Sequence, residues 1–184
     1  MNGISLLIAA LLSTAALGAD RSPYAGEEVR SIRSLSADEV KALRSGGGMG
    51  FAKLAELNHY PGPKHVLDLA DDLELTPSQL TESQELFVEM QRSAVALGEK
   101  LLEAEMDLDL EFEQGTITPE SLNSALSEIG RLRAQLRYVH LEAHLRQRHL
   151  LSANQIAKYD EVRGYRDPGH DHKNHSKNHK RQTH

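Results

Sequence analysis

The segment EQGTITPE, residues 113–120, joins two long stretches of helical pattern and predicts how they pack. Gly115 is a typical C-terminal stop for the helix before it, because glycine adopts the left-handed backbone conformation without strain. Thr118 followed by Pro119 is a typical helix start, with a hydroxyl cap and then proline at the first helical position. Since the link of residues 115–118 is so short, the two helices should be antiparallel neighbours.

The two long helices are expected over residues 77–114 and 119–150. Thr76 and Gln79 form a capping box before the first helix, which would be about 57 Å long. Each helix carries a narrow apolar seam with spacings of three, four or seven residues, suited to a partner helix at a shallow crossing angle. The first seam consists of Leu80, Phe87, Met90, Ala94, Leu97, Leu101, Ala104 and Leu108. The second consists of Leu122, Leu126, Ile129, Leu132, Leu136, Val139, Ala143 and Leu150.

Short helices are expected on both sides of this hairpin. Their ranges are about 51–58, 64–72 and 152–164, and another begins at a capping box of Ser36 and Glu39. The glycine run 46–50 has no following Gly-Lys-Ser/Thr and no preceding strand, which favours a flexible joint over a phosphate loop. No strand pattern appears, so the predicted fold is all-α: a long antiparallel helical hairpin with short flanking helices.

The chain divides into four predicted parts. They are a signal peptide (1–18), a flexible N-terminal segment (19–50), the hairpin domain (51–165) and a His-rich C-terminal tail (166–184). The tail has no apolar side chain with which to offset ordering entropy, so we expect it to be disordered. The apolar seams exceed what one hairpin can bury, which predicts a homodimer or an exposed concave apolar face.

The first 18 residues predict export. They read MNGISLLIAALLSTAALG, carry no charged side chain and end in small residues, which is the form of a secretory signal cut before Ala19. Their apolar run is shorter than the ~20 residues that span a bilayer. The chain has no cysteine, which excludes a disulfide framework and thiolate chemistry. We expect a protein of the bacterial periplasm; the alternative is an uncleaved N-terminal anchor.

Charge and motif content argue against two classes of function. The net charge is −6, and residues 163–184 hold six basic and two acidic side chains, which leaves −10 on the remainder. An acidic body argues against a nucleic-acid partner, because phosphate contacts need clustered Lys and Arg. The sequence contains no His-Glu-x-x-His motif, nucleophile elbow or glycine phosphate loop, so we do not expect an enzyme.

Two histidines of the second long helix are candidate metal ligands. His140 and His144 are four residues apart, so their side chains emerge on one face and can chelate one ion. In an antiparallel hairpin they lie level with about residues 93 and 89, which puts Glu89 and Met90 at the right height. Glu142 is a candidate for the surroundings of the site. The alternative is a pair of exposed, unpaired histidines beside the apolar seam.

The remaining histidines fall into two groups. His59 and His149 are more typical of packing or cap residues. The tail carries His170, His172, His175, His179 and His184 in a chain that can wrap an ion. Because imidazole is a borderline ligand, we expect this tract to bind zinc, copper or nickel, with low affinity and little selectivity. The alternative is a soluble basic tail.

Two motifs of one form open helices on either side of the hairpin: LTPSQ at 75–79 and LSANQ at 151–155. This arrangement, over roughly residues 51–165, resembles the LTxxQ-motif family of small periplasmic proteins. The family includes the Spy and CpxP stress chaperones, the zinc-binding ZraP and the CnrX-type heavy-metal sensors. In the sensor branch, a His before the first motif joins a helical His-x-x-x-Met pair and a carboxylate from the first long helix. The resemblance implies that His65 joins His140 and His144, with His144 in the place of the methionine.

The resemblance implies two functions. The first is a periplasmic, non-enzymatic metal-binding protein of the heavy-metal sensor type, which holds zinc, nickel, cobalt or copper and has a membrane signalling partner. The alternative is an ATP-independent chaperone that holds unfolded client proteins on a concave apolar and charged surface. A sensor needs a preorganised site, whereas a chaperone needs exposed apolar area and tolerates loss of the histidines.

Overall fold

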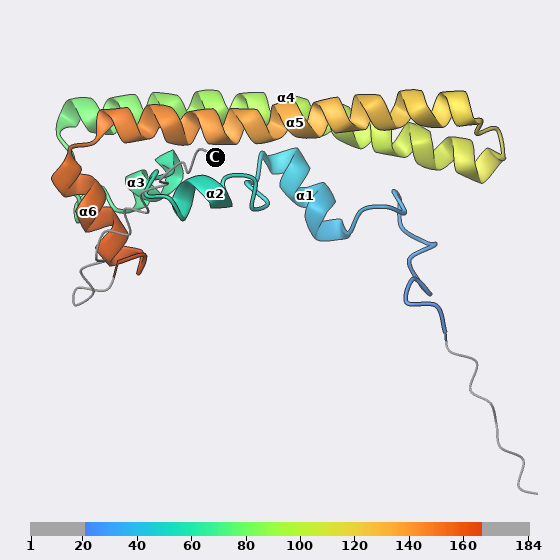
Figure 1. Cartoon of the computed structure of the whole chain (residues 1–184), viewed down its shortest axis with the longest axis horizontal. Helices are drawn as coiled ribbons and strands as arrows, with labels where there is room; N and C mark the ends of the chain where they lie inside the picture. The colour runs from blue at the N-terminus through green and yellow to red at the C-terminus, as the bar shows by residue number, and fades with distance from the viewer. Residues whose placement is uncertain (1–20, 167–184) are drawn as a thin grey trace, which may run out of the picture.

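The computed structural model describes residues 21–166, which fold into helices without any strand in that range. The two long helices, α4 (Pro77–Gln114) and α5 (Pro119–Leu150), lie side by side and pack against each other (Figure 1). Thr76 caps α4 by accepting a hydrogen bond from the backbone N–H of Gln79, and Gly115 ends it with a φ of 65°. The predicted helical fold with two packed long helices is therefore confirmed, and both helices have the predicted bounds.

The main core lies between the long helices and under the N-terminal segment. Its buried members are Ile32, Leu35, Leu43, Ala94, Leu101, Leu102, Ile129, Leu132 and Leu136. Among the predicted seam residues only Leu126 is classed as exposed, at 52%. Leu102 lies outside the predicted seam, and it is buried because it belongs to the same cluster as Ile32 and Leu35. A third layer therefore covers part of α4 that a two-helix packing would leave bare.

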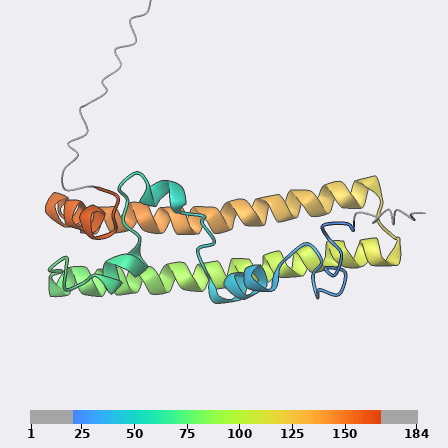
Figure 2. The ribbon, with the colours of Figure 1, turned by 90° about the horizontal axis from the view of Figure 1, so that it is seen from below.

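The short helices lie along one face of the long pair (Figure 2). Helix α1 (Ala37–Ser45) packs on α4, α2 (Lys53–Glu56) packs on α5, and α3 (Pro63–Asp68) contacts both. Both α2 and α3 are shorter than predicted. His59 has a left-handed φ of 64° and is followed by Tyr60-Pro-Gly-Pro63, so no further helical turn fits between the two helices.

Residues 32–45 pack on the long pair, although the sequence analysis set residues 19–50 apart as a flexible segment. Helix α1 begins at the predicted capping box and lies so close to α4 that a Cβ on Gly98 would overlap the carbonyl oxygen of Leu43. Upstream of α1, the hydroxyl of Ser34 donates a hydrogen bond of 2.9 Å to Glu105, which also pairs with Arg133 at 2.6 Å. Only glycine at position 98 permits this approach.

The two LTxxQ-like motifs meet in space, although 76 residues separate their glutamines. The side-chain amides of Gln79 and Gln155 donate to each other's oxygen, at 2.9 Å in both directions. Each amide also donates to a backbone carbonyl, Gln79 to Leu150 and Gln155 to Leu73, and each oxygen accepts from the cap residue of its own helix. The motif thus caps two helices and joins them.

Helix α6 (Ala153–Val162) closes this end of the long pair (Figure 1). Its Tyr159 is fully buried and forms a second core cluster with Val66, Leu73 and Leu151. Among the helices of residues 21–166, none is both long enough and apolar enough to cross a membrane.

Candidate metal site

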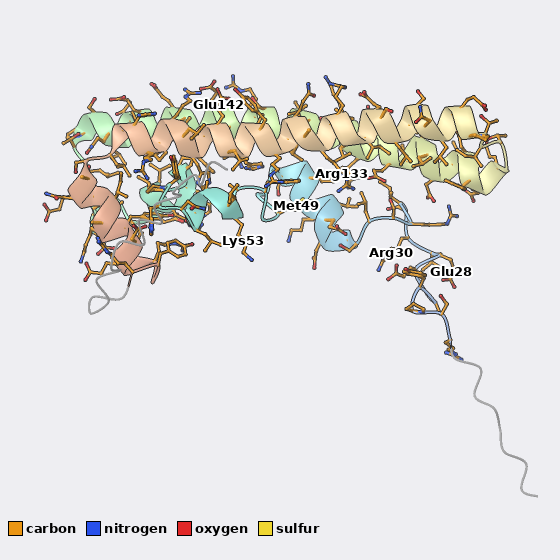
Figure 3. All side chains as sticks on the ribbon, in the orientation of Figure 1. Glu28, Arg30, Met49, Lys53, Arg133 and Glu142 are labelled. Atoms are coloured by element: carbon orange, nitrogen blue, oxygen red, sulfur yellow. The ribbon has the colours of Figure 1, made fainter. Side chains whose placement is uncertain are left out.

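A pocket of about 770 Å³ lies between the short helices and the long pair, and four of the predicted ligands line it: His65, Met90, His140 and His144. The glycine run 46–50 also lines it, as do residues of α2 and the start of α3. Gly46 ends α1 and Gly50 precedes α2, both with positive φ, so the run shapes one wall of the pocket. Lys53, on the rim, points away from the long pair (Figure 3).

His144 is held in one tautomer by the backbone. It is 8% exposed, and its Nδ1 lies 2.8 Å from the carbonyl oxygen of Tyr60. A carbonyl only accepts hydrogen bonds, so Nδ1 carries the proton and Nε2 keeps the free electron pair. This is the arrangement that usually orients a metal-binding imidazole. The glycine at position 62 is needed here, because a Cβ on it would lie 2.9 Å from that Nε2.

His140 is buried beside it, one helical turn away. It is 4% exposed, its ring stacks on Phe51 with centroids 5.8 Å apart, and its Nε2 has no hydrogen-bond partner among the described residues. Burial lowers the pKa of His140 below the usual 6.5, and the charge of a protonated His144 would lower it further. The interpretation of the pair as exposed histidines is therefore wrong. Near neutral pH, His140 presents the uncharged form that coordinates metals.

The carboxylate in the pocket is Glu56 of α2, which the sequence analysis did not select. The hydroxyl of the buried Tyr159 donates to both of its oxygens, at 2.8 and 3.0 Å. Burial, and then this hydrogen bond, raise the pKa of Tyr159, so its hydroxyl remains a donor. A Cβ on Gly62 would lie 3.0 Å from Glu56 Oε1 and 2.7 Å from His144 Cε1, which places the carboxylate beside the imidazole. No local pattern links these residues in the sequence.

Glu89 does not join the pocket, contrary to the prediction. It lies outside the lining residues and forms an ion pair of 2.8 Å with Arg146, whose hydrogen bond lowers the pKa of the Glu89 carboxyl. The next residue, Met90, is the one that α4 turns toward the histidines. Glu142 points away from the short helices (Figure 3), so it does not surround the site either.

The remaining predicted histidines lie elsewhere. His59 pairs through Nδ1 with Asp160 at 2.8 Å, in keeping with a structural role, and His149 is exposed on α5. His65 lies 3.5 Å from Asp68 on its own helix while lining the pocket. The tail histidines 170, 172, 175, 179 and 184 lie outside the described residues.

The donor set is that of a borderline transition metal: imidazole, thioether and carboxylate. The buried, unpartnered Nε2 of His140 and the fixed tautomer of His144 fit such an ion. Nevertheless, no three His, Asp or Glu side chains of residues 21–166 converge closely enough to hold one. The pocket thus offers a preorganised pair of imidazoles with further donors nearby, and not a closed coordination sphere. Comparisons with models of protein families, with curated proteins and with solved structures found no match.

Proposed function

We propose that this chain binds a divalent transition metal ion, zinc, nickel, cobalt or copper, through His140 and His144 and acts as a non-enzymatic metal-responsive protein of the periplasm. One observation carries the proposal: two buried imidazoles lie a helical turn apart in one pocket. One is fixed in the metal-binding tautomer, and the Nε2 of the other has no hydrogen-bond partner within residues 21–166. A buried polar nitrogen left unpaired costs about 1–3 kcal/mol. An ion that takes this nitrogen as a ligand removes that penalty.

The position of the pocket suits a sensor. His140 and His144 come from the long pair, whereas Glu56 and His65 come from the short helices, so an ion drawing on both would tie α2 and α3 to α5. Glu56 is also bonded to Tyr159 of α6. Occupancy of the site would therefore change how firmly the short helices are held, which is a structural change that a membrane signalling partner can read.

The same proposal includes the topology of the long pair, the family of the chain and its export. We take the long pair as the antiparallel hairpin of an LTxxQ-motif protein, exported by residues 1–18. The direct pairing of Gln79 with Gln155 supports this assignment, because it gives both motif copies a shared role beyond helix capping.

The experiment is thermal unfolding of the full chain with and without each metal. An ion that binds only the folded state adds RT ln(1 + [L]/Kd), about 2.7 kcal/mol at 100-fold excess over Kd, or roughly 5–10 °C in Tm. Metal that the C-terminal tail binds equally well in the folded and in the unfolded protein does not change the Tm. The double variant His140→Ala/His144→Ala should lose the gain, whereas His149→Ala, an exposed histidine of the same helix, should keep it. An undiminished gain in the double variant would overturn the proposal.

A chaperone remains the second candidate, and exposed apolar side chains favour it. Met106 and Leu110 are one turn apart on α4 and both are exposed, so they present adjacent apolar surface to solvent. The measurement is suppression of the aggregation of an unfolded model protein by the full chain. If the chaperone function is correct, Met106→Glu/Leu110→Glu abolishes suppression and His140→Ala/His144→Ala does not.

A further inference from the structure

The pocket beside His140 and His144 is larger than a metal ion requires. Its volume is about 770 Å³, whereas each water molecule on an ion takes about 30 Å³. An ion with a few water ligands therefore fills only a small part of the pocket. Binding sites for small organic molecules have volumes of about 300–1,000 Å³. The pocket thus has the size of an organic-ligand site.

The walls of the pocket leave this space open. Gly48 and Gly50 line it, and a Cβ built on either glycine would meet nothing within 4 Å. Apolar side chains also line it, among them Leu57, Phe87 and Tyr165. A lining that is partly apolar, with a few polar groups at defined places, is typical of sites for small molecules. Here the polar groups are the two imidazoles.

The imidazoles leave part of the coordination sphere of an ion open. No third His, Asp or Glu of residues 21–166 converges on His140 and His144. Copper(II) and nickel(II) favour square-planar or tetragonal coordination by nitrogen and oxygen. Two nitrogens that come from one face of one helix take adjacent positions on such an ion. The remaining adjacent positions are those that a bidentate chelator occupies.

The charge of the pocket favours an anionic chelator. Neutral imidazoles leave the double positive charge of the ion uncompensated, and a buried charge is costly unless it is paired. Among the lining residues of the range 21–166, Glu56 is the only carboxylate, and Lys53 and Lys64 add positive charge. Glu56 is already bonded to the hydroxyl of Tyr159. A ligand that brings its own carboxylate therefore stabilises the ion more than water does.

We propose that the pocket takes its metal as a complex with a small α-amino acid, whose amine nitrogen and carboxylate oxygen fill the two positions beside His140 and His144. This inference rests on the proposed function and names the second ligand of that site. The amino acid displaces two water molecules from the ion, and its ammonium group releases one proton to solvent. No bond within the protein is made or broken. The side chain of the amino acid lies in the space beside the glycine run.

The test compares thermal unfolding of the full chain with copper(II) alone and with the same amount of copper(II) plus one equivalent of free glycine. If the protein takes the bare ion, glycine competes for copper and lowers the Tm. If it takes the complex, glycine raises the Tm. We expect a rise of about 3–6 °C above copper(II) alone, which corresponds to about tenfold tighter binding. Betaine is the control, because its fully methylated nitrogen cannot coordinate, and it should leave the Tm unchanged.

Equilibrium dialysis with radiolabelled glycine then counts the amino acid that is held with copper(II). We expect the parent to retain about one equivalent more than His140→Ala/His144→Ala. A Tm that glycine lowers or leaves unchanged, or equal retention by the two proteins, overturns the inference. The proposed function still stands in that case if the double variant loses the stabilisation by copper(II) alone. If the double variant keeps that stabilisation, both fall.

Discussion

Gly62 lies where the chain between α2 and α3 passes the imidazole of His144. A Cβ at this position would meet His144 Cε1 at 2.7 Å, its Nε2 at 2.9 Å and Glu56 Oε1 at 3.0 Å. Side-chain atoms do not approach a Cβ this closely, so position 62 sets the arrangement of the imidazole and the carboxylate. The pocket is therefore sensitive to a single methyl group.

The first prediction is that Gly62→Ala lowers the free energy of unfolding by about 1–3 kcal/mol and removes most of the stabilisation by zinc. The added methyl group must displace His144 or Glu56, because the space is filled. Thermal unfolding with and without zinc measures both effects. Gly48→Ala is the control, since it lines the same pocket and a Cβ there would meet nothing within 4 Å. Equal behaviour of the two variants would contradict the prediction.

The second residue-scale prediction concerns acid. Because the pKa of His140 is lowered in the folded state, the unfolded chain binds the additional proton below about pH 6.5. The metal-free protein should therefore lose stability as the pH falls below 6.5, with His140 contributing up to about 1.4 kcal/mol per pH unit. Denaturant unfolding between about pH 7.5 and pH 5, a range that brackets the ordinary imidazole pKa of ~6.5, measures this loss. His140→Gln should flatten the profile and His149→Gln should not; parallel profiles would count against it.

At the scale of elements, α1 is held on α4 by close backbone approach and by apolar contact. Leu43 of α1 is buried in the main core, and its carbonyl faces Gly98. The capping box in the sequence predicts α1, but a single glycine within α4 does not predict that α1 packs against it. Such a glycine costs about 1 kcal/mol of helix propensity relative to alanine, and here the docking of α1 offsets that cost.

The third prediction compares two glycines within long helices. Gly98→Ala should destabilise the protein by about 1–3 kcal/mol, because the methyl group forces α1 away from α4. Gly130→Ala on α5 should stabilise it by up to about 1 kcal/mol, because nothing lies within 4 Å of its Cβ position and alanine favours the helix. Chemical denaturation of both variants gives the two free energies. Stabilisation by Gly98→Ala would show that α1 does not dock as described.

The fourth prediction concerns the glutamines that join the starts of α4 and α6. A double-mutant cycle of Gln79→Ala and Gln155→Ala should give a coupling energy of about 0.5–3 kcal/mol, because the two side chains donate to each other. The control cycle pairs Gln155→Ala with Ser121→Ala. Ser121 belongs to the capping box at the start of α5, whereas α6 follows the end of α5. This control cycle should show additivity. A coupling no larger than in the control would mean that each glutamine acts only as a cap.

For the molecule as a whole, the apolar stripe that the sequence assigns to a dimer partner is covered mostly within one chain. Residues 32–43 and Phe51 pack on the long pair, and Leu126 is the seam residue left exposed. Other apolar side chains remain uncovered on the face opposite the short helices. Tyr138 and Leu145 lie on α5 on either side of Glu142, which points away from those helices (Figure 3), and both are exposed.

The fifth prediction is that the protein is a homodimer that buries Tyr138 and Leu145. Light scattering at micromolar concentration should give twice the chain mass, and Leu145→Glu should give a monomer. Leu54→Glu, an exposed position on α2, serves as the control and should leave the dimer intact. A monomeric parent protein would contradict the prediction directly.

The sequence by itself determined where the two long helices begin and end and that they pair. Caps, prolines and glycines act on neighbouring residues through backbone hydrogen bonds and allowed φ values, so they can be recognised without knowledge of the fold. The spacing of four also determined that His140 and His144 share a face. Met90 and His65 were placed in the pocket from helix register and from family resemblance, respectively, and both line it.

Only the tertiary structure decided which carboxylate meets the histidines and whether the histidines are buried. Glu56 is oriented by Tyr159, 103 residues away, and the choice of Met90 over Glu89 depends on how α4 is rotated about its axis against α5. Small side chains such as Gly62 and Gly98 then determine how closely segments approach. These contacts are single approaches between distant parts of the chain, and unlike the apolar seams of the long helices they leave no periodic signal in a single sequence.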